Sequence, residues 1–354
     1  MINPKIEINN RVISENHSPY VIAELSANHN GSIETAMKII EEAKLANADA
    51  VKLQTYTAET ITLESSEPDF QIKGGLWDGN TLFDLYNEAH MPWEWHETLF
   101  KHAAKIGITI FSSPFDNTAV DFLEDLNAPA YKIASFEAID LPLIEYVAST
   151  GKPMIISTGM ANLEEIAEAI AAAQGAGCAE LAILHCVSGY PALAIDYNIK
   201  TITELKNQFG LVTGLSDHTL DNNTAIASVA LGASIIEKHF TLDRLAGGPD
   251  DSFSLEPLEL ASLCEGAGTA WSSLGEVNFS RKSSEEANAQ FRRSLYFVKD
   301  LKLGEIITKN AIRSVRPGYG MLPKYFKAVI GQKVTCDIAK NTPVKNQFLE
   351  KPIY

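Results

Sequence analysis

Short runs of apolar and β-branched residues recur along the chain, and most of them end in a polar or charged side chain. Alanine-rich stretches separate the runs, with apolar residues at the spacing of an amphipathic helix. Eight runs have the length of a buried strand, at 20–24, 50–54, 108–113, 131–135, 154–158, 181–186, 211–217 and 234–240. Strands that alternate with helices predict a parallel α/β sheet, and eight repeats predict closure into a (β/α)8 TIM barrel.

The intervening stretches support this prediction, and one of them is unusually long. Helical spacing is clearest at 33–46, 161–177 and 222–232. An open doubly wound sheet is the alternative, but no GxGxxG motif follows the first strand. The stretch between the second and third strands ends in a helix, which an aromatic, glycine-containing insertion at 74–96 precedes. Long insertions are often functional, so we expect ligand selectivity there; a packed lid without ligand contact is the alternative.

The pattern changes after about residue 275, where helical alternation stops. A polar segment at 280–290 is typical of a linker, and short strands and turns follow it. We therefore expect a barrel domain over 1–279, a linker over 280–290 and a small β-rich domain over 291–354. A domain of that size buries little core and often relies on a partner surface.

Composition narrows the possible partners and compartments. The formal net charge of −16 argues against nucleic acid or an anionic membrane as a partner. No apolar run approaches the ~20 residues of a membrane span, and the N-terminal stretch lacks the apolar region of a secretory signal. The four cysteines form no CxxC pair, so we expect reduced thiols in a cytoplasmic protein.

In a parallel barrel the loops after the strands build the active site. The strand ends carry one carboxylate, two lysines, one amide and several hydroxyls, at Glu24, Lys52, Lys132, Gln54, Ser113, Ser135, Ser157, Ser188 and Ser216. Lysine charge and hydroxyl donors suit a ligand with phosphate and carboxylate groups. Taken singly, such a serine is more often a helix N-cap, and such a lysine a solvated or paired charge.

Three strand-end residues, His218, His239 and Glu24, carry chemistry of their own. His218 and His239 follow neighbouring strands, and two imidazoles can bind a borderline divalent ion; a hydrogen-bonded structural pair is the alternative. Glu24 can handle a proton or water beside an anion, or it can serve as a helix cap or ion-pair partner. In 234–240, strand alternation places Glu237 inside the barrel, one layer below His239, and Lys238 against the helices.

A set of ordered motifs resembles the sialic acid synthase family. The motifs are IAELSANHNG, ADAVKLQTY, SSPFD, YKIAS, ISTGM, LHCVSGYP, GLSDHT and EKHFTLDR followed by GGPDDSFSLEP. The likeness extends from about residue 18 to the end, where the segment around RPGYG is similar to the family's SAF (antifreeze-like) domain. Within the family, the stretch GGLWDGNTLFDLYNEAHMPWEWH and the serine of HCVSGYP resemble the pseudaminic acid synthase branch.

The resemblance implies a metal-dependent transferase. It would condense phosphoenolpyruvate with a diacetamido-trideoxy hexose, 2,4-diacetamido-2,4,6-trideoxy-β-L-altropyranose, and water to give pseudaminic acid and phosphate. It also implies a domain-swapped homodimer in which each SAF domain lies over the partner's barrel mouth. N-acetylneuraminate or legionaminate synthesis by the same chemistry is the alternative.

The resemblance also implies roles for individual residues. His218 and His239 match the ligands of a divalent cation, with Mn²⁺ expected first and Mg²⁺ or Co²⁺ as alternatives. Glu24, Asp250 and Arg316 match catalytic positions, with Arg316 reaching the partner's sugar. The substrate-binding positions are Lys52, Gln54, Ser113, Lys132, Ser135, Ser157, Ser188, Tyr190 and Ser216.

Two rival functions remain at this point. A lyase of the same fold would form a Schiff base through a desolvated lysine, for which Lys132 is the candidate. A non-enzymatic sugar-binding module would bind sugar without consuming phosphoenolpyruvate, but the cluster at the strand ends disfavours it.

Overall fold

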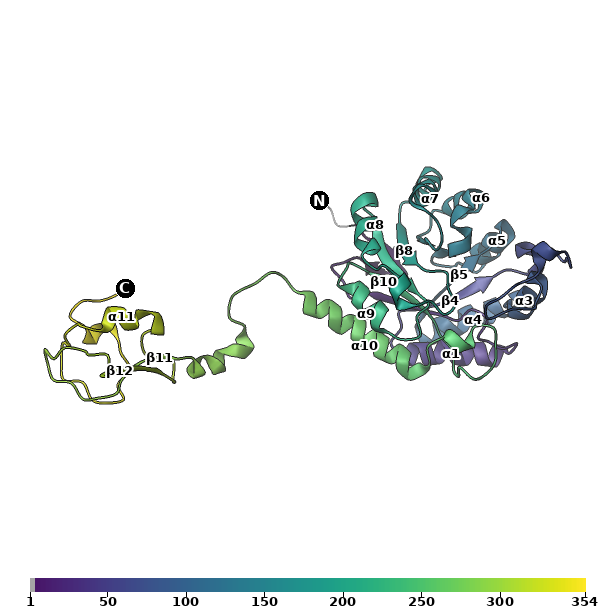
Figure 1. The fold of residues 1–354 in the computed structure, drawn as a ribbon. Coiled ribbons are helices and arrows are strands. Elements are labelled where there is room, and N and C mark those ends of the chain that lie inside the picture. The colour runs from purple at the N-terminus through teal and green to yellow at the C-terminus, as the bar shows by residue number, and fades with distance from the viewer. Residues whose placement is uncertain (1–3) are drawn as a thin grey trace. The chain divides into compact units, whose positions relative to one another are not determined.

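The computed structural model describes residues 4–354 of the chain. These residues form two compact units, the first ending at Gly275 and the second spanning Glu276–Tyr354. Figure 1 labels their helices and strands. No helix within residues 4–354 combines the length and apolar character that crossing a membrane requires.

The first unit is a closed barrel of eight parallel strands, as the repeat predicted. Each strand pairs with its neighbours along the chain, and β10 closes the ring by pairing with β3, Ile235 opposite Tyr20 and His239 opposite Glu24. The strands are β3 (Tyr20–Glu24), β4 (Ala50–Thr55), β5 (Thr109–Pro114), β6 (Tyr131–Ile133), β7 (Met154–Ser157), β8 (Leu181–Cys186), β9 (Val212–Asp217) and β10 (Ile235–His239).

Alternation along these strands separates the barrel interior from the layer under the helices. The lower interior holds one apolar cluster that includes Phe111, Ile155 and Leu184. A short antiparallel hairpin, β1 (Ile6–Ile8) and β2 (Arg11–Ile13), adds its isoleucines to that cluster and closes the N-terminal end. Apolar packing therefore fills the bottom of the barrel, and the polar strand ends face the open top.

Helices cover the outside of the barrel, and local sequence fixes their ends. Ser32 accepts a hydrogen bond from the Thr35 amide at the start of α1, and Asn162 with Glu165 forms a capping box at the start of α7. The covering helices are α1 (Ile33–Leu45), α4 (Trp93–Ile106), α5 (Asn117–Asp125), α6 (Leu141–Ala148), α7 (Leu163–Gly175), α8 (Thr201–Phe209), α9 (Asn223–Val229) and α10 (Pro257–Leu274).

The long stretch between β4 and α4 contains two extra helices, α2 (Ala58–Ile61) and α3 (Leu82–Ala89). Thr81 caps α3 by accepting from the Asp84 amide at 3.0 Å. The spacing of Leu82, Leu85 and Ala89 puts these side chains on one face of α3, and that face borders the cavity described below.

The second unit has its own apolar core, which includes Leu295, Phe297 and Val344. Its regular elements are short: β11 (Ser294–Phe297) pairs antiparallel with β12 (Ile312–Val315), and α11 spans Phe326–Val329. The segment 280–290, expected as a plain linker, contains most of a 3-10 helix over Ser283–Phe291.

Candidate active site

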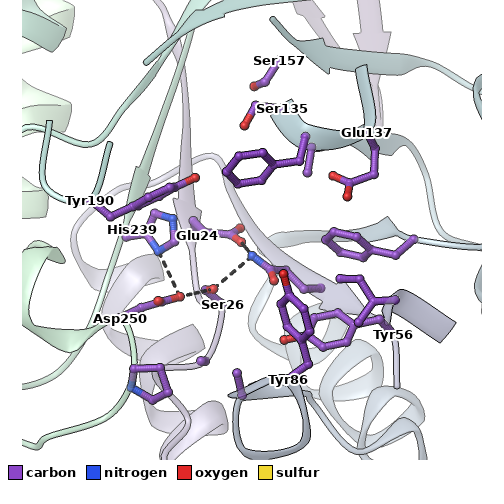
Figure 2. A pocket seen from close by; sticks show the side chains of 18 of the residues that line it. Glu24, Ser26, Tyr56, Tyr86, Ser135, Glu137, Ser157, Tyr190, His239 and Asp250 are labelled. Atoms are coloured by element: carbon purple, nitrogen blue, oxygen red, sulfur yellow. Dashed lines mark hydrogen bonds and ion pairs between the residues drawn. The ribbon is translucent and has the colours of Figure 1, made fainter. Parts of the chain in front are cut away.

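A cavity of about 320 Å³ opens among the C-terminal ends of the barrel strands. Its volume lies in the range of sites for small molecules. Most of the residues expected at the site line it: Glu24, Lys52, Gln54, Lys132, Ser135, Ser157, Tyr190, Ser216, His218, His239 and Asp250. Figure 2 shows several of these side chains converging from separate strands and loops.

Two buried lysines and two buried glutamates form the floor of the cavity. Lys52 on β4 lies 2.8 Å from Glu24 Oε2 and donates to Ser113 Oγ at 3.0 Å. Lys132 on β6 donates to Glu237 Oε1 at 2.9 Å. All four side chains are almost fully buried, so their charges interact through little water. The paired charges balance, and the two ammonium groups are already aimed at the space a ligand would enter.

The two glutamates of the floor differ in their protonation. Burial raises the pKa of Glu24 to about 7, even though the Lys52 ammonium opposes the shift. Burial also acts to raise the pKa of Glu237, but Lys132 and Lys52 together outweigh it and hold that pKa below its usual value. Glu24 can therefore exchange a proton near neutral pH, while Glu237 stays ionised and anchors the lysines.

Small hydroxyl side chains, among them Ser135 and Ser157, also line the cavity. Ser135 and Ser188 lie with their oxygens 2.9 Å apart. Gly159 permits this approach, because a Cβ there would come within 2.4 Å of Ser135 Cβ. Within the described chain, the buried Ser157 hydroxyl has no hydrogen-bond partner. An unsatisfied buried donor that faces a cavity indicates a place for a ligand.

The two histidines line the cavity side by side, with ring centroids 5.5 Å apart in an edge-to-face arrangement. His218 Nδ1 lies 2.8 Å from the Val187 carbonyl, so it carries the proton and leaves Nε2 with a lone pair. Burial lowers the pKa of His218 to about 4 and that of His239 well below its usual value, so both rings are neutral at pH 7. The Tyr190 ring packs against the His218 ring, with the two ring centroids 4.3 Å apart.

A chain of polar contacts joins the His239 loop to the first barrel strand (Figure 2). Asp250 Oδ2 lies 3.6 Å from His239 Nδ1 and accepts a 2.5 Å hydrogen bond from Ser26 Oγ. Gln54 Nε2 donates to both Ser26 Oγ and Glu24 Oε1, at 3.0 and 2.8 Å. Burial raises the pKa of Asp250 to about 6. The network fixes the position of Asp250 relative to the floor.

The glycine-rich loop after β10 is shaped by hydrogen bonds to Asp251. Asp251 accepts from the Gly248 amide at 2.7 Å, from Thr241 Oγ1 at 2.5 Å and from Asn30 Nδ2 at 3.0 Å. A side chain at position 248 would collide with Asn30. Asp251 is therefore the cap of the loop that carries Asp250 to the cavity.

The insertion between β4 and α4 supplies an apolar wall on another side of the cavity. Trp77 Nε1 donates to the Pro249 carbonyl at 3.0 Å, which ties the insertion to the loop after β10. Tyr56 and Tyr86 pack edge to face. The wall is completed by aliphatic side chains, namely Ile61, Ile72, Leu82, Leu85 and Ala89.

Comparison with known proteins places this arrangement in a family. The model of the NeuB family matches residues 39–279, and that of the SAF domain matches residues 292–350. The chain belongs to the NeuB family. Pseudaminic acid synthase of Campylobacter jejuni subsp. jejuni serotype O:23/36 is 43% identical to it over 90% of this chain and 93% of that protein.

Two further relatives are synthases of other acids. N,N'-diacetyllegionaminic acid synthase of Campylobacter jejuni subsp. jejuni serotype O:2 is 37% identical over 89% of this chain and 95% of that protein. The crystal structure of N-acetylneuraminic acid synthetase from Leptospira borgpetersenii serovar Hardjo-bovis, in complex with citrate, superposes with a TM-score of 0.73. The two sequences are 31% identical, and the superposition covers 82% of this chain and 96% of the Leptospira chain.

Two barrel residues expected at the site of this NeuB-family chain, Ser113 and Ser188, do not line the cavity. Ser113 lies beneath Lys52 and positions its ammonium. Ser188 lies behind Ser135. Arg316 belongs to the second unit, where it is exposed.

The cavity also contains groups that the sequence reasoning missed. Glu137 lies on a 3-10 turn over Ser135–Ile139, and burial raises its pKa to about 7. Within the described residues its Oε2 atom lacks a hydrogen-bond partner. Cys186, at the end of β8, also lines the cavity. The sequence signal for Glu137 was its position two residues after Ser135, the serine of YKIAS. The strand predicted over 131–135 ends before Glu137, so the strand-end pattern did not include it.

The NeuB resemblance implies a divalent metal, for which the histidine pair is the candidate site. No three His, Cys, Asp or Glu side chains in residues 4–354 form a ready-made metal cluster. His239 Nδ1 is nevertheless buried without a hydrogen-bond partner among those residues, 3.6 Å from Asp250 Oδ2, and the His218 ring lies beside the His239 ring. Two neutral imidazoles with the Asp250 carboxylate nearby suit Mn²⁺ or Co²⁺. The donor set therefore fits the ion.

Proposed function

We propose that this chain condenses phosphoenolpyruvate with 2,4-diacetamido-2,4,6-trideoxy-β-L-altropyranose and water to give pseudaminic acid and phosphate. The observation that carries the proposal is the two-sided cavity, with paired lysines at its floor and an apolar wall beside them. The similarity to the Campylobacter jejuni pseudaminic acid synthase supports the choice of sugar.

The floor suits phosphoenolpyruvate, which carries a phosphate and a carboxylate. Lys52 and Lys132 supply two fixed positive charges, and Ser135, Ser157 and Ser216 supply hydroxyl donors around them. These groups are held in place before the ligand arrives, so little reorganisation accompanies the movement of charge during reaction.

The reaction forms one carbon–carbon bond and breaks one carbon–oxygen bond. C3 of phosphoenolpyruvate attacks the aldehyde carbon of the open-chain sugar, whose oxygen takes up a proton and becomes a hydroxyl. Water adds to the resulting cationic C2 and loses a proton. The tetrahedral intermediate then expels phosphate and leaves the keto group. Glu24, with a pKa of about 7, is suited to stabilise the cation as carboxylate and to accept the proton from water.

His218 and His239 would hold the divalent ion, which supplies Lewis acidity toward the sugar aldehyde when bound. Removal of the ion with a chelator should abolish turnover, and return of Mn²⁺ should restore it. Full activity after exhaustive chelation would contradict the metal role. His239→Ala should lose the ion while the barrel stays folded, and an unfolded variant would favour a structural role for the pair.

The apolar wall suits the acceptor. The proposed sugar presents a C6 methyl and two acetamido methyl groups, and it lacks hydroxyls at C4 and C6, where common hexosamines carry them. Aliphatic side chains such as Leu82 and Leu85 offer these methyl groups contact that a hydroxyl would not gain. The same chemistry on a neuraminate or legionaminate precursor is the second candidate.

The proposal includes a homodimer in which Arg316 of one chain acts at the cavity of its partner. Co-expression of Arg316→Ala with Lys132→Met tests it, because a mixed dimer would contain one intact composite site. Activity in the mixed dimers would support the action of Arg316 at the partner's cavity. Mixed dimers without activity would contradict it. Truncation before residue 290 should abolish turnover and leave a folded barrel.

The decisive assay follows the bond that breaks. With ¹⁸O in the bridge between carbon and phosphorus, the label should appear in the released phosphate. Label in the keto product would mean phosphorus–oxygen cleavage and would contradict the proposed route. Borohydride with pyruvate should trap no adduct on Lys132, because the lysine is charged and ion-paired. A trapped adduct would favour the Schiff-base lyase, and binding of sugar without phosphate release would favour a binding module.

A further inference from the structure

Lys238 carries a charged group into the apolar layer between the barrel and its helices. Alternation along β10 turns Glu237 and His239 toward the barrel interior, while Ile236 and Phe240 pack among the helices with the outer core. Lys238 shares that outer face and is only 2% exposed. A lysine in such a place is rare unless its charge is paired, so its contacts carry information.

The Lys238 ammonium is bonded to the segment that carries His218. It donates to Asp217 Oδ2 at 2.9 Å, to the Thr219 carbonyl at 2.6 Å and to the Asp221 carbonyl at 2.9 Å. Asp217 and Thr219 are the residues on either side of His218, and Lys238 immediately precedes His239. One side chain therefore ties together the two segments that bear the paired histidines.

The Lys238–Asp217 pair differs from the other buried ion pairs of the barrel. Among residues 4–354, the other ion pairs with both partners under 10% exposed lie at the cavity floor, where a ligand can use their charges. Lys238 and Asp217 do not line the cavity. A buried ion pair is a weak source of stability, since well-packed apolar residues often replace it at no loss. Directed bonds to two carbonyl oxygens, in contrast, need an ammonium group.

We propose that Lys238 is a positioning residue that sets the geometry of His218 and His239 toward the divalent ion. Its bonds hold the turn after β9 against β10, and so fix where the His218 ring stands relative to His239. Two other contacts complete the alignment: the His218 amide donates to Tyr197 Oη at 2.6 Å, and His218 Nδ1 to the Val187 carbonyl at 2.8 Å. The inference rests on the proposed function for the identity of the ion, but the alignment itself is a property of the unliganded chain.

The test separates alignment from stability with three variants of the full-length protein. Lys238→Met removes the ammonium and leaves Asp217 without a charged partner, bonded only to the amide and the hydroxyl of Thr219. The double variant Asp217→Asn/Lys238→Met removes both charges, keeps a side-chain oxygen for the Thr219 amide, and should recover part of the melting temperature that the single variant loses. Leu123→Ala is the matched control: Leu123 lies on the buried face of α5, in a core cluster that includes neither histidine, so its loss should lower the melting temperature without contact to either ring.

Two readouts are measured on metal-free protein. Titration with Mn²⁺, followed by electron paramagnetic resonance, should show about tenfold weaker binding or worse for the single and double Lys238 variants. Leu123→Ala should bind Mn²⁺ as the unmodified chain does. Nitrogen-15 spectra should show the His218 Nδ1 proton shifted, or exchanging faster, in both Lys238 variants.

The outcomes distinguish this inference from the proposed function. A double variant with unchanged Mn²⁺ affinity and unchanged His218 resonances would overturn the role of Lys238. If the unmodified chain binds no Mn²⁺ but the resonances still move in both Lys238 variants, the alignment stands and the metal in the proposed function is refuted. Loss of Mn²⁺ affinity in Leu123→Ala to the same extent would show that any loss of stability weakens the site, and would also overturn the inference.

Discussion

The floor and the wall of the cavity are built in different ways. The floor consists of charged residues at strand ends, where Lys52 pairs with Glu24 and Lys132 with Glu237. The wall consists of aliphatic and aromatic side chains from the insertion between β4 and α4, which stands outside the strand–helix repeat. The barrel register holds the floor rigid, whereas the wall depends on α3 and on the Trp77 contact with the Pro249 carbonyl.

This difference suggests a division of labour. The charges of the floor can hold an anion during chemistry, and their positions cannot change without disturbing the barrel. The wall can change its side chains without altering any strand. We therefore expect substitutions in the floor to act on turnover, and substitutions in the wall to act on the choice of acceptor.

The largest effect is expected in the floor, from Lys132→Met. Loss of the ammonium removes a preorganised charge and leaves Glu237 buried with one cation fewer. We expect kcat/KM for phosphoenolpyruvate to fall on the order of a thousandfold, measured by phosphate release. Lys152→Met is the matched control, since Lys152 pairs with Glu124 at the surface. Equal losses in both variants would mean that lysine charge acts through the whole surface and not through the floor.

A smaller effect is expected at Glu137, whose carboxyl has a folded-state pKa of about 7, above its ordinary value of 4.5, because of burial. The protonated form is favoured in the folded chain, so its contribution to stability is full below pH 4.5 and is lost as pH rises to 7. Glutamine does not titrate, so Glu137→Gln should avoid this loss. The increase in the free energy of unfolding that the substitution causes should be about 2 kcal/mol larger at pH 8 than at pH 5. Denaturant unfolding at both pH values measures this. The same change at pH 5 and pH 8 would show that the group does not titrate in this range.

The smallest of these effects is expected in the wall, from Leu85→Asn. The amide would oppose an apolar part of the acceptor, and we expect the KM for the sugar to rise about tenfold. The KM for phosphoenolpyruvate should not change, because the floor is untouched. Leu85→Met keeps the apolar surface and serves as the control. A rise in both KM values would erase the distinction between floor and wall.

The sequence predicted the floor far better than the wall. Strand ends follow from periodicity, and β3 and β8 have the predicted bounds. Alternation also placed Lys238 toward the helices and Glu237 in the interior, as the structure shows. β6 ends at Ile133, two residues before its predicted end, because the chain turns into the 3-10 segment that carries Ser135 and Glu137.

Other features lay beyond what a sequence pattern can give. Ser113 and Ser188 have the right residue type at the right strand, yet they contact Lys52 and Ser135 instead of lining the cavity. The wall depends on which face of α3 meets the barrel, and an insertion outside the repeat has no register to predict that. The bonds of Lys238 to two backbone carbonyls likewise depend on the path of the turn after β9.

The central claim is that the floor takes phosphoenolpyruvate while the wall selects a 6-deoxy diacetamido sugar. Its most direct test is kcat/KM with the altrose acceptor, its legionaminate counterpart and N-acetylmannosamine, each with phosphoenolpyruvate, and with product identity set by mass and nuclear magnetic resonance. We predict pseudaminic acid as the main product, with the altrose acceptor favoured at least tenfold over the others. Equal or faster turnover of N-acetylmannosamine would contradict the role of the wall, and equal or faster turnover of the legionaminate counterpart would contradict the choice of the altrose acceptor.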